Sequence, residues 1–384
     1  MATIEQQLEK LQADKQLLVD NLVSKGIEAS SEETFTTLVP KVSNIMYEPR
    51  SFKGFEEYEG IELNNEVKNF NPVNLTSLYN FFNKCKNLTS LDLTHWNTSN
   101  ITTFTALFNG CSKLASLNLN GWDSSKVVSM SDMFNSCPKL TELDLSDWNV
   151  SSVKTCYEMF YSCTKLKKLN LKNWKFTASE NVSLGCMFWY CYDLSEIDVS
   201  GWDTSSVSYI GSMFRNCRSL TYLNLEHFNT SKVTGIANIF EGATALTTLE
   251  ISSWDMSKAT SFGNAFSSCE SLKNIDISSW CTDNVTNMGG LFQNCNSLEN
   301  LNLSNWNTQN VTTMTSIFSG CYSLKYLDIR NFEFTDKLIN TGGMFSNVPS
   351  DCEIIVKDDI ARNWILAKRD VFTNIKTVAE LEAV

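Results

Sequence analysis

The sequence predicts one right-handed parallel solenoid of about ten repeats, because two columns of side chains recur with a single period. Cysteine recurs from Cys85 to Cys321 every 26 residues or a multiple of it, with one gap of 28 residues. Tryptophan keeps the same period from Trp96 to Trp306, and phenylalanine replaces it at two positions. A period of this length marks units that cannot bury their own apolar face and must stack on their neighbours.

Each repeat is expected to hold one short strand and one helical segment, which makes the fold an α/β repeat. Apolar and polar residues alternate at Leu91, Asp92 and Leu93, and this pattern predicts a strand with one buried face. After the Trp, apolar residues follow in steps of three and four from Val127 to Cys137, which predicts a helical turn or a 3₁₀ segment. Between them, Asp or Asn followed by Ser or Thr suits an Asx turn and a helix N-cap.

The residue between the two strand leucines is expected to face outward, and carboxylates largely alternate with asparagine in this column. Like charges on neighbouring strands repel, and an interposed asparagine roughly doubles their spacing. We interpret the column as a solvated ladder, with a calcium or ligand stripe as the alternative. Its members are Asp92, Asn118, Asp144, Asn170, Asp198, Asn224, Glu250, Asp276, Asn302 and Asp328.

The cysteine column indicates buried, reduced thiols rather than disulfides. Equivalent side chains on stacked strands lie at least ~4.8 Å apart, whereas a disulfide needs Cβ atoms ~3.5–4.5 Å apart. Ala243 occupies one rung of the column, which a packing role tolerates. The sequence lacks the short Cys and His spacings of metal sites, so no metal and no other cofactor is expected. Cys186, Cys281 and Cys352 lie outside the column and have no assigned role.

Composition excludes several functional classes. The 384 residues include 31 basic and 43 acidic side chains, and the net charge of -12 argues against a nucleic-acid partner. The sequence has no apolar run long enough to span a membrane, and Met1 to Asn21 lacks the apolar core of a signal peptide. We therefore expect no membrane partner and a product made in the cytoplasm.

Catalytic motifs are also absent from the sequence. The two histidines, His95 and His227, occupy the same exposed position in two distant repeats, so neither has an evident general-base role. Neither a nucleophile elbow nor a phosphate-binding glycine loop is present. We therefore do not expect an enzyme.

The repeat resembles that of the BspA-like bacterial surface protein family, a subgroup of the leucine-rich repeats. The resemblance rests on the Trp-Asp-Thr-Ser-x-Val segment at Trp202 to Val207 and on the Met-Phe-x-x-Cys segment at Met133 to Cys137. It covers about residues 67–345. It implies a parallel leucine-rich-repeat solenoid that serves adhesion and binds proteins or glycans at a bacterial cell surface, without catalysis.

The two ends are expected to differ from the repeats. We expect a helical attachment or oligomerisation module at residues 1–46, an N-terminal cap at 47–66 and a C-terminal cap at 346–384. The C-terminal cap should contain a strand at 352–357 and a helix at about 360–368. The N-terminal module carries a heptad stripe, which favours either a short coiled coil or an amphipathic helix folded back on its own chain. The stripe consists of Ile4, Leu8, Leu11, Leu18 and Leu22.

The N-terminal module resembles modules of bacteriophage tail and fibre proteins. The resemblance rests on the short Leu-rich helix, the turn at Lys25 and Gly26, and the Leu-Val-Pro-Lys-Val-x-x-Ile tail, and it covers about 45 residues. It implies contacts with other virion proteins, a homotrimer, and a location in the virion after synthesis in the host cytoplasm.

One stretch of the array departs from its neighbours. The column after Phe in Met-Phe-x-x-Cys is polar or small in most repeats but aromatic in two consecutive ones, and the same stretch carries a two-residue insertion between Trp174 and Met187. Exposed Trp, Tyr and Arg on adjacent rungs are typical of binding hot spots and sugar-stacking platforms. Chance drift in a tolerant column is the alternative. The candidate ligand-binding residues are Tyr161, Trp189, Tyr190, Tyr192, Arg215 and Arg218.

These observations predict a non-enzymatic binding or adhesion protein. We expect a bacteriophage tail or fibre component that presents the solenoid to a protein or glycan receptor on a bacterial surface. The alternatives are a bacterial or microbial cell-surface adhesin and an intracellular scaffold that binds proteins.

Overall fold

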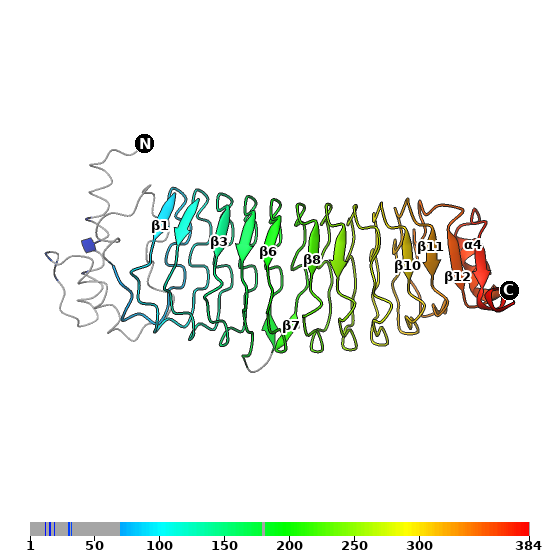
Figure 1. The fold of residues 1–384 in the computed structure, drawn as a ribbon, viewed down its shortest axis with the longest axis horizontal. Coiled ribbons are helices and arrows are strands. Elements are labelled where there is room, and N and C mark those ends of the chain that lie inside the picture. Colours follow the sequence, from blue (N-terminus) through cyan, green and yellow to red (C-terminus); the bar gives the residue numbers. More distant parts are fainter. Residues whose placement is uncertain are drawn as a thin grey trace.

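The computed structural model describes residues 70–178 and 181–383, together with six isolated residues nearer the N-terminus. Apart from those six, the attachment module expected at residues 1–46 and the cap expected at 47–66 lie outside the described residues. The described chain is an elongated stack of turns that ends in two short helices (Figure 1).

Over most of the stack, a short strand pairs in parallel with the equivalent strand of a neighbouring rung, which confirms the predicted solenoid. The pairing is interrupted in places, for example between the strands at Ser116–Asn118 and Glu142–Asp144. The central leucines set the register: Leu91 lies opposite Leu117, and Leu143 opposite Leu169. Each strand therefore repeats the buried position of the one before it. The strands of this ladder are β1 (Ser90–Asp92), β2 (Ser116–Asn118), β3 (Glu142–Asp144), β4 (Lys168–Asn170), β6 (Glu196–Asp198), β8 (Tyr222–Asn224), β9 (Thr248–Glu250), β10 (Asn300–Asn302) and β11 (Tyr326–Asp328).

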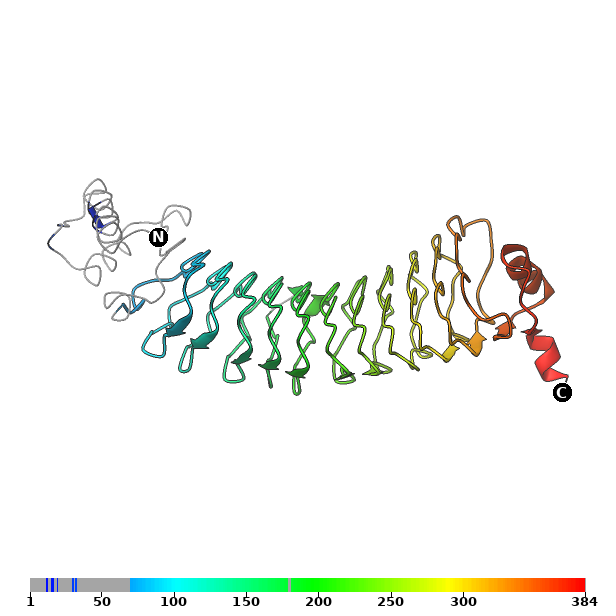
Figure 2. The same ribbon diagram turned by 90° about the horizontal axis from the view of Figure 1, so that it is seen from above.

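A second parallel ladder runs along the opposite edge of the stack. It consists of single bridges, such as Ser77 to Thr103, and of the short strands β5 (Val182–Ser183) and β7 (Val207–Tyr209). The stack bends gently, with the main strands on the outer side of the arc and β7 on the inner side (Figure 2). The apolar core lies between the two ladders.

The segment that returns from the second ladder to the main strands is not helical, contrary to the prediction. It is a run of tight turns, in which Asn135 N–H donates to the carbonyl oxygen of Asp132 at 3.0 Å. Other N–H groups bond to the next rung, as Phe134 does to Met159 at 2.8 Å. Asp132 and Ser136 have positive φ angles of 57° and 58°, and such left-handed residues interrupt a helix in every repeat.

The tryptophan and cysteine columns tie successive rungs together, and both are buried as predicted. The Trp122 Nε1–H donates to the Leu93 carbonyl of the preceding rung at 2.9 Å, and the Cys137 thiol donates to the Phe108 carbonyl at 3.1 Å. All thirteen cysteines are free, and twelve of them are buried. Burial raises the pKa of Cys163 to about 12, so this thiol stays protonated near neutral pH.

The outward carboxylates and asparagines have a structural role. The Asp92 carboxylate accepts the backbone N–H of Thr94 at 3.1 Å, and this bond holds the pKa of Asp92 below its ordinary value. The Asn170 side chain donates to the Asp144 carboxylate on the preceding rung at 3.0 Å. The alternation therefore lets Asn170 and Asn224 each donate to one neighbouring carboxylate, in addition to closing turns.

Two members of this column depart from the pattern. On the rung of Glu250, the backbone N–H of Ser252 donates instead to Glu226 of the preceding rung, at 2.7 Å. Asp328 was expected to face outward, but it is only 2% exposed because Arg330 covers it, with Nη2 at 2.6 Å from Oδ2. The outward orientation is therefore wrong at Asp328.

The C-terminal end contains the expected strand and helix. β12 (Glu353–Val356) continues the main ladder beside β11, and α4 (Asp359–Lys368) follows it. β13 (Ile375–Thr377), parallel to β12, and α5 (Val378–Glu382) were not predicted. The Trp364 ring of α4 stacks on Phe334 with centroids 4.3 Å apart, which covers the last turn of the solenoid.

Candidate binding site

The six candidate residues lie together on the returning turns of consecutive rungs. Tyr161, Trp189, Arg215 and Glu241 follow one another in a single column. The rings of Tyr161 and Trp189 meet edge to face with centroids 5.3 Å apart, and the Arg215 guanidinium lies 4.6 Å from the Trp189 ring centroid. Arg215 then pairs with Glu241 at 2.8 Å, so each member of the column contacts the next.

Tyr190, Tyr192 and Arg218 extend this group sideways. The Tyr190 ring stacks on Trp189 with centroids 5.1 Å apart and contacts Tyr192 at 5.6 Å. The Arg218 guanidinium lies 4.5 Å from the Tyr192 centroid. We call Tyr161, Trp189, Tyr190, Tyr192, Arg215 and Arg218 the aromatic–arginine cluster.

The four aromatic side chains of the cluster were expected to be exposed, but they are half-buried. Arg215 is half-buried as well, and Arg218 is exposed. The cause is mutual packing: the rings cover one another, and the two guanidinium groups lie over the faces of Trp189 and Tyr192. The cluster is therefore a mixed surface of ring edges and cationic groups, and it is not an open stacking platform.

The backbone under the cluster is unusual in its residue types. Each returning turn has two left-handed positions, filled in most rungs by Asn, Ser, Asp or Gly. On the rungs of Tyr161 and Trp189, three of the four positions hold Glu158, Cys186 and Tyr190, with φ angles of 55°, 57° and 65°; elsewhere only Lys84 and Ala106 among the described residues depart from the usual types. Such residues adopt this conformation at some energetic cost, and strain of this kind gathers at functional sites.

Three buried polar atoms at the cluster have no hydrogen-bond partner among the described residues: Trp189 Nε1, Arg215 Nε and Glu241 Oε2. The Arg215–Glu241 pair is only about a quarter exposed, with side-chain values of 26% and 23%. A partly desolvated pair of this kind holds Arg215 firmly over Trp189. Sequence reasoning missed Glu241, although it occupies the same column one rung after Arg215.

Two further tyrosines lie on the inner edge near the cluster, and the sequence analysis did not single them out. Tyr209 is 43% exposed and Tyr157 is 38% exposed. The Tyr209 ring lies over Gly185, where an added Cβ would approach the ring to 2.2 Å. Gly185 therefore makes room for Tyr209. The two-residue insertion between Trp174 and Met187 precedes this edge of the rung and does not adjoin the cluster.

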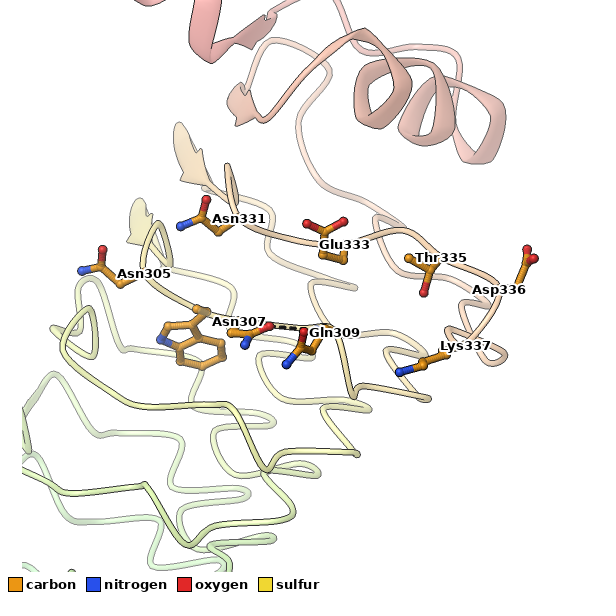
Figure 3. A pocket seen from close by; sticks show the side chains of 9 residues that line it. Asn305, Asn307, Gln309, Asn331, Glu333, Thr335, Asp336 and Lys337 are labelled. Carbon is orange, nitrogen blue, oxygen red and sulfur yellow. Dashed lines mark hydrogen bonds between the residues drawn. The ribbon is translucent and has the colours of Figure 1, made fainter.

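A shallow groove near the C-terminal end was also not predicted. It has a volume of about 640 Å³, and side chains from two successive rungs face it (Figure 3). The connection from Phe332 to the next bridge is one residue longer than the equivalent one from Trp306. Since Trp306 is fully buried, the groove offers polar groups and no exposed aromatic face. Its lining consists of Asn305, Trp306, Asn307, Gln309, Asn331, Glu333, Thr335, Asp336 and Lys337.

The described ranges carry neither a cluster of metal ligands nor a membrane-spanning helix. Within residues 70–178 and 181–383, no group of three or more His, Cys, Asp or Glu side chains is placed to hold a metal ion. In the same part of the chain, no helix combines the length and apolar character needed to cross a bilayer. His95 and His227 each bond through Nε2 to a backbone carbonyl of the preceding rung, at 3.1 and 2.9 Å.

Comparison with solved structures finds bacterial leucine-rich repeat proteins. A leucine-rich repeat protein from Bacteroides ovatus is 15% identical, with 79% of this chain and 88% of that chain covered and a TM-score of 0.33. One from Leptospira interrogans is 15% identical, covering 90% and 81%, with a TM-score of 0.28. An internalin from Listeria monocytogenes is 16% identical, covering 71% and 81%, with a TM-score of 0.24.

No curated protein matches this chain. A family model described as "Mycoplasma protein of unknown function, DUF285" matches three overlapping segments, residues 76–195, 179–275 and 260–353. These segments cover nearly all of the repeat array and well over half of the chain. The chain therefore belongs to the DUF285 family.

Proposed function

We propose that this chain is a non-enzymatic binding protein, whose solenoid presents the aromatic–arginine cluster to a protein or glycan on a bacterial surface. The observation that carries the proposal is the cluster itself: columns that are mostly polar or small elsewhere become aromatic and cationic on consecutive rungs. Trp, Tyr and Arg are the residue types that dominate binding energy at interfaces.

The rest of the rung explains why such a cluster suits recognition. At the cluster, Trp and Cys side chains bond successive rungs to one another, so the backbone that supports the cluster is held on both sides. Rings and guanidinium groups that already pack on one another lose little conformational freedom on binding. A preorganised surface of this kind binds without rearrangement of the fold.

Binding of the fluorescently labelled chain to bacterial cells, measured by flow cytometry over a panel of species, tests the proposal. Tyr192→Ala should weaken binding about tenfold or more. Tyr322→Ala is the matched control, since Tyr322 occupies the same column on a distant rung and is 58% exposed. Equal binding by both variants and the unchanged protein would refute a role for the cluster.

A more specific role, as part of a bacteriophage tail or fibre, rests on the resemblance of residues 1–46 to modules of such proteins. These residues lie outside the described ones apart from six positions. In that role the module would contact other virion proteins and form a homotrimer. A bacterial cell-surface adhesin and an intracellular scaffold are the competing roles. Flanking capsid, tail and lysis genes would favour the first, and sedimentation of the full chain at tens of micromolar as a monomer would refute the trimer.

A further inference from the structure

We propose that the ligand of the aromatic–arginine cluster is an acidic glycan, a linear sugar polymer that carries carboxylate, sulfate or phosphate groups. It would lie across the rungs, along a row of lysines that leads to Arg218. This inference rests on the proposed function and assigns a chemical class to the ligand of the same site.

The lysine row consists of Lys113, Lys139 and Lys165, which occupy one column on three consecutive rungs. All three side chains are exposed. Lys113 Nζ donates to the Asn87 side chain at 2.9 Å, and Lys139 forms no ion pair among the described residues. Since neighbouring rungs are ~4.8 Å apart, the row presents evenly spaced cations along the axis of the stack.

The row runs directly into the aromatic–arginine cluster. Lys165 pairs with Asp193 on the next rung at 3.1 Å, and Asp193 adjoins Tyr192 in the chain. Arg218 lies over the Tyr192 ring, and its hydrogen bond to a side chain is a long contact of 3.5 Å with Asn216. Within the described residues, no carboxylate pairs with Arg218, so its charge remains available to an anion.

The lysine row lies in a region of positive net charge, although the whole chain is negatively charged. Residues 70–178 contain eleven lysines and no arginine against seven Asp and Glu, whereas residues 181–383 contain thirteen Lys and Arg against twenty-two Asp and Glu. Because salt screens charges over ~8 Å under physiological conditions, a ligand on the first rungs experiences mainly the local excess of lysine. The net charge of -12 therefore does not prevent an anionic ligand from binding there.

Three features favour a glycan over other polyanions. The rung spacing is similar to the length of one sugar residue, so successive acidic groups can meet successive lysines. Ring edges of the cluster can pack against a sugar at the end of the row. Nucleic acid requires many phosphate contacts for useful affinity, and the row offers three lysines and Arg218.

The test uses the full chain and matched pairs of polymers. Isothermal titration would compare polygalacturonate with its methyl ester, dextran sulfate with dextran, and polyphosphate as the sugar-free anion. The charged member of at least one sugar pair should bind, its neutral counterpart should not, and added salt should weaken binding. The preferred pair would identify carboxylate or sulfate as the acidic group, and the phosphate form would be tested with a sugar-phosphate polymer.

Two triple variants with the same change of charge separate the row from a general charge effect. The row variant should weaken binding of the charged polymer about tenfold or more. It carries Lys113→Ser, Lys139→Ser and Lys165→Ser. The control carries Lys232→Ser, Lys258→Ser and Lys273→Ser on later rungs and should change binding less than about twofold. Circular dichroism would verify that both variants are folded.

The outcomes distinguish the two proposals. If Tyr192→Ala abolishes binding to cells but no acidic sugar polymer binds, or the row variant binds as well as its control, the glycan inference is wrong and the proposed function stands. If polyphosphate, duplex DNA or polyglutamate binds as tightly as the best acidic glycan, the ligand class is wrong. If Tyr192→Ala changes nothing, the proposed function is wrong and this inference with it.

Discussion

Rungs inside the aromatic–arginine cluster and rungs outside it share one backbone but differ in the residues at its left-handed positions. On a regular rung these positions hold Asp132 and Ser136, whereas on the central rung of the cluster they hold Cys186 and Tyr190, all with φ between 57° and 65°. The left-handed conformation costs an ordinary side chain roughly 1–2 kcal/mol. Regular rungs hold such a residue at one position at most, as at Lys84 beside Asn80 and Ala106 beside Gly110. The solenoid therefore does not require the pair on the central rung, and its presence there needs a reason other than folding.

The outward columns show the same contrast. Asn109, Ser267 and Ser319 occupy positions that Tyr161 and Trp189 fill in the cluster. Asn109 and Ser319 are half-buried and Ser267 is buried, so the two regions differ in residue type and in ring packing rather than in exposure. Substitutions on the regular rungs should therefore change mainly stability, and substitutions in the cluster should change mainly binding. Variants in the two regions can separate these roles.

The largest expected effect compares one tryptophan from each region. Trp280 is 1% exposed, and its Nε1–H donates to the Ile251 carbonyl, so Trp280→Ala should lower the free energy of unfolding by ~3–5 kcal/mol. Trp189→Ala should cost less than about half of that, since Trp189 is only half-buried. Urea denaturation would measure both values. Equal losses would mean that Trp189 belongs to the core.

The next effect concerns the left-handed positions. Gly110 has a φ of 74°, and an added Cβ would lie 3.3 Å from the Lys84 side chain, so Gly110→Ala should cost ~1 kcal/mol or more. Ala106, with a φ of 54°, should gain up to ~1 kcal/mol when replaced by Gly. Urea denaturation of these two variants would measure how much a left-handed backbone position contributes to the free energy of unfolding.

Tyr190→Gly extends this measurement to the cluster. Relief of the left-handed backbone should offset much of the lost ring packing, so stability should change by less than ~1 kcal/mol while binding to cells falls. A stability loss as large as that of Trp280→Ala would show that the ring serves the fold.

The sequence predicted those features that repetition makes visible. The repeat period, seen in about ten units, predicts the parallel ladder in which Leu91 lies opposite Leu117. It also predicts the buried Trp122 and Cys137. The returning segment was predicted wrongly, because consecutive tight turns also place apolar residues in steps of three and four. The residues Asp132 and Ser136 do not by themselves indicate a turn, since neither residue type requires a left-handed backbone.

The candidate site was predictable in its grouping but not in its detail. Residues in one column, such as Trp189 and Arg215, become neighbours once the period is known. The stacking of Arg218 over Tyr192 depends on side-chain rotamers, which a sequence does not specify. The groove depends on the path of one longer connection, so the repeat pattern could not reveal it.

Adjacent rungs provide a smaller comparison in the outward column. The Asp276 side chain accepts the backbone N–H of Ser278 at 3.2 Å, so Asp276→Ala should cost ~0.5–1.5 kcal/mol. Glu250→Ala should cost less, because the equivalent N–H on its rung, that of Ser252, donates to Glu226. Among the described residues, the Glu250 carboxylate accepts only from the exposed side chains of Asn224 and Tyr222. Thermal unfolding of both variants would decide this, and a larger loss at Glu250 would contradict the assignment.

The smallest expected effect is the pH dependence of the turn carboxylates. The backbone bond from Thr94 lowers the pKa of Asp92 from 3.8, and the side-chain bonds from Ser125 and Ser257 lower the pKa values of Asp123 and Asp255. A carboxyl whose pKa is lower in the folded than in the unfolded state stabilises the fold above the unfolded value and loses that contribution as the pH falls through the folded value.

The melting temperature should therefore be steady near neutral pH and fall as the pH drops below about 4. A variant with Asp92→Asn, Asp123→Asn and Asp255→Asn keeps an oxygen to accept each bond, as asparagine does at Asn118 and Asn149, but it cannot titrate. Its melting temperature should fall less steeply over the same acidic range. Identical curves for the variant and the unchanged chain would mean that acid does not act through these three carboxyl groups.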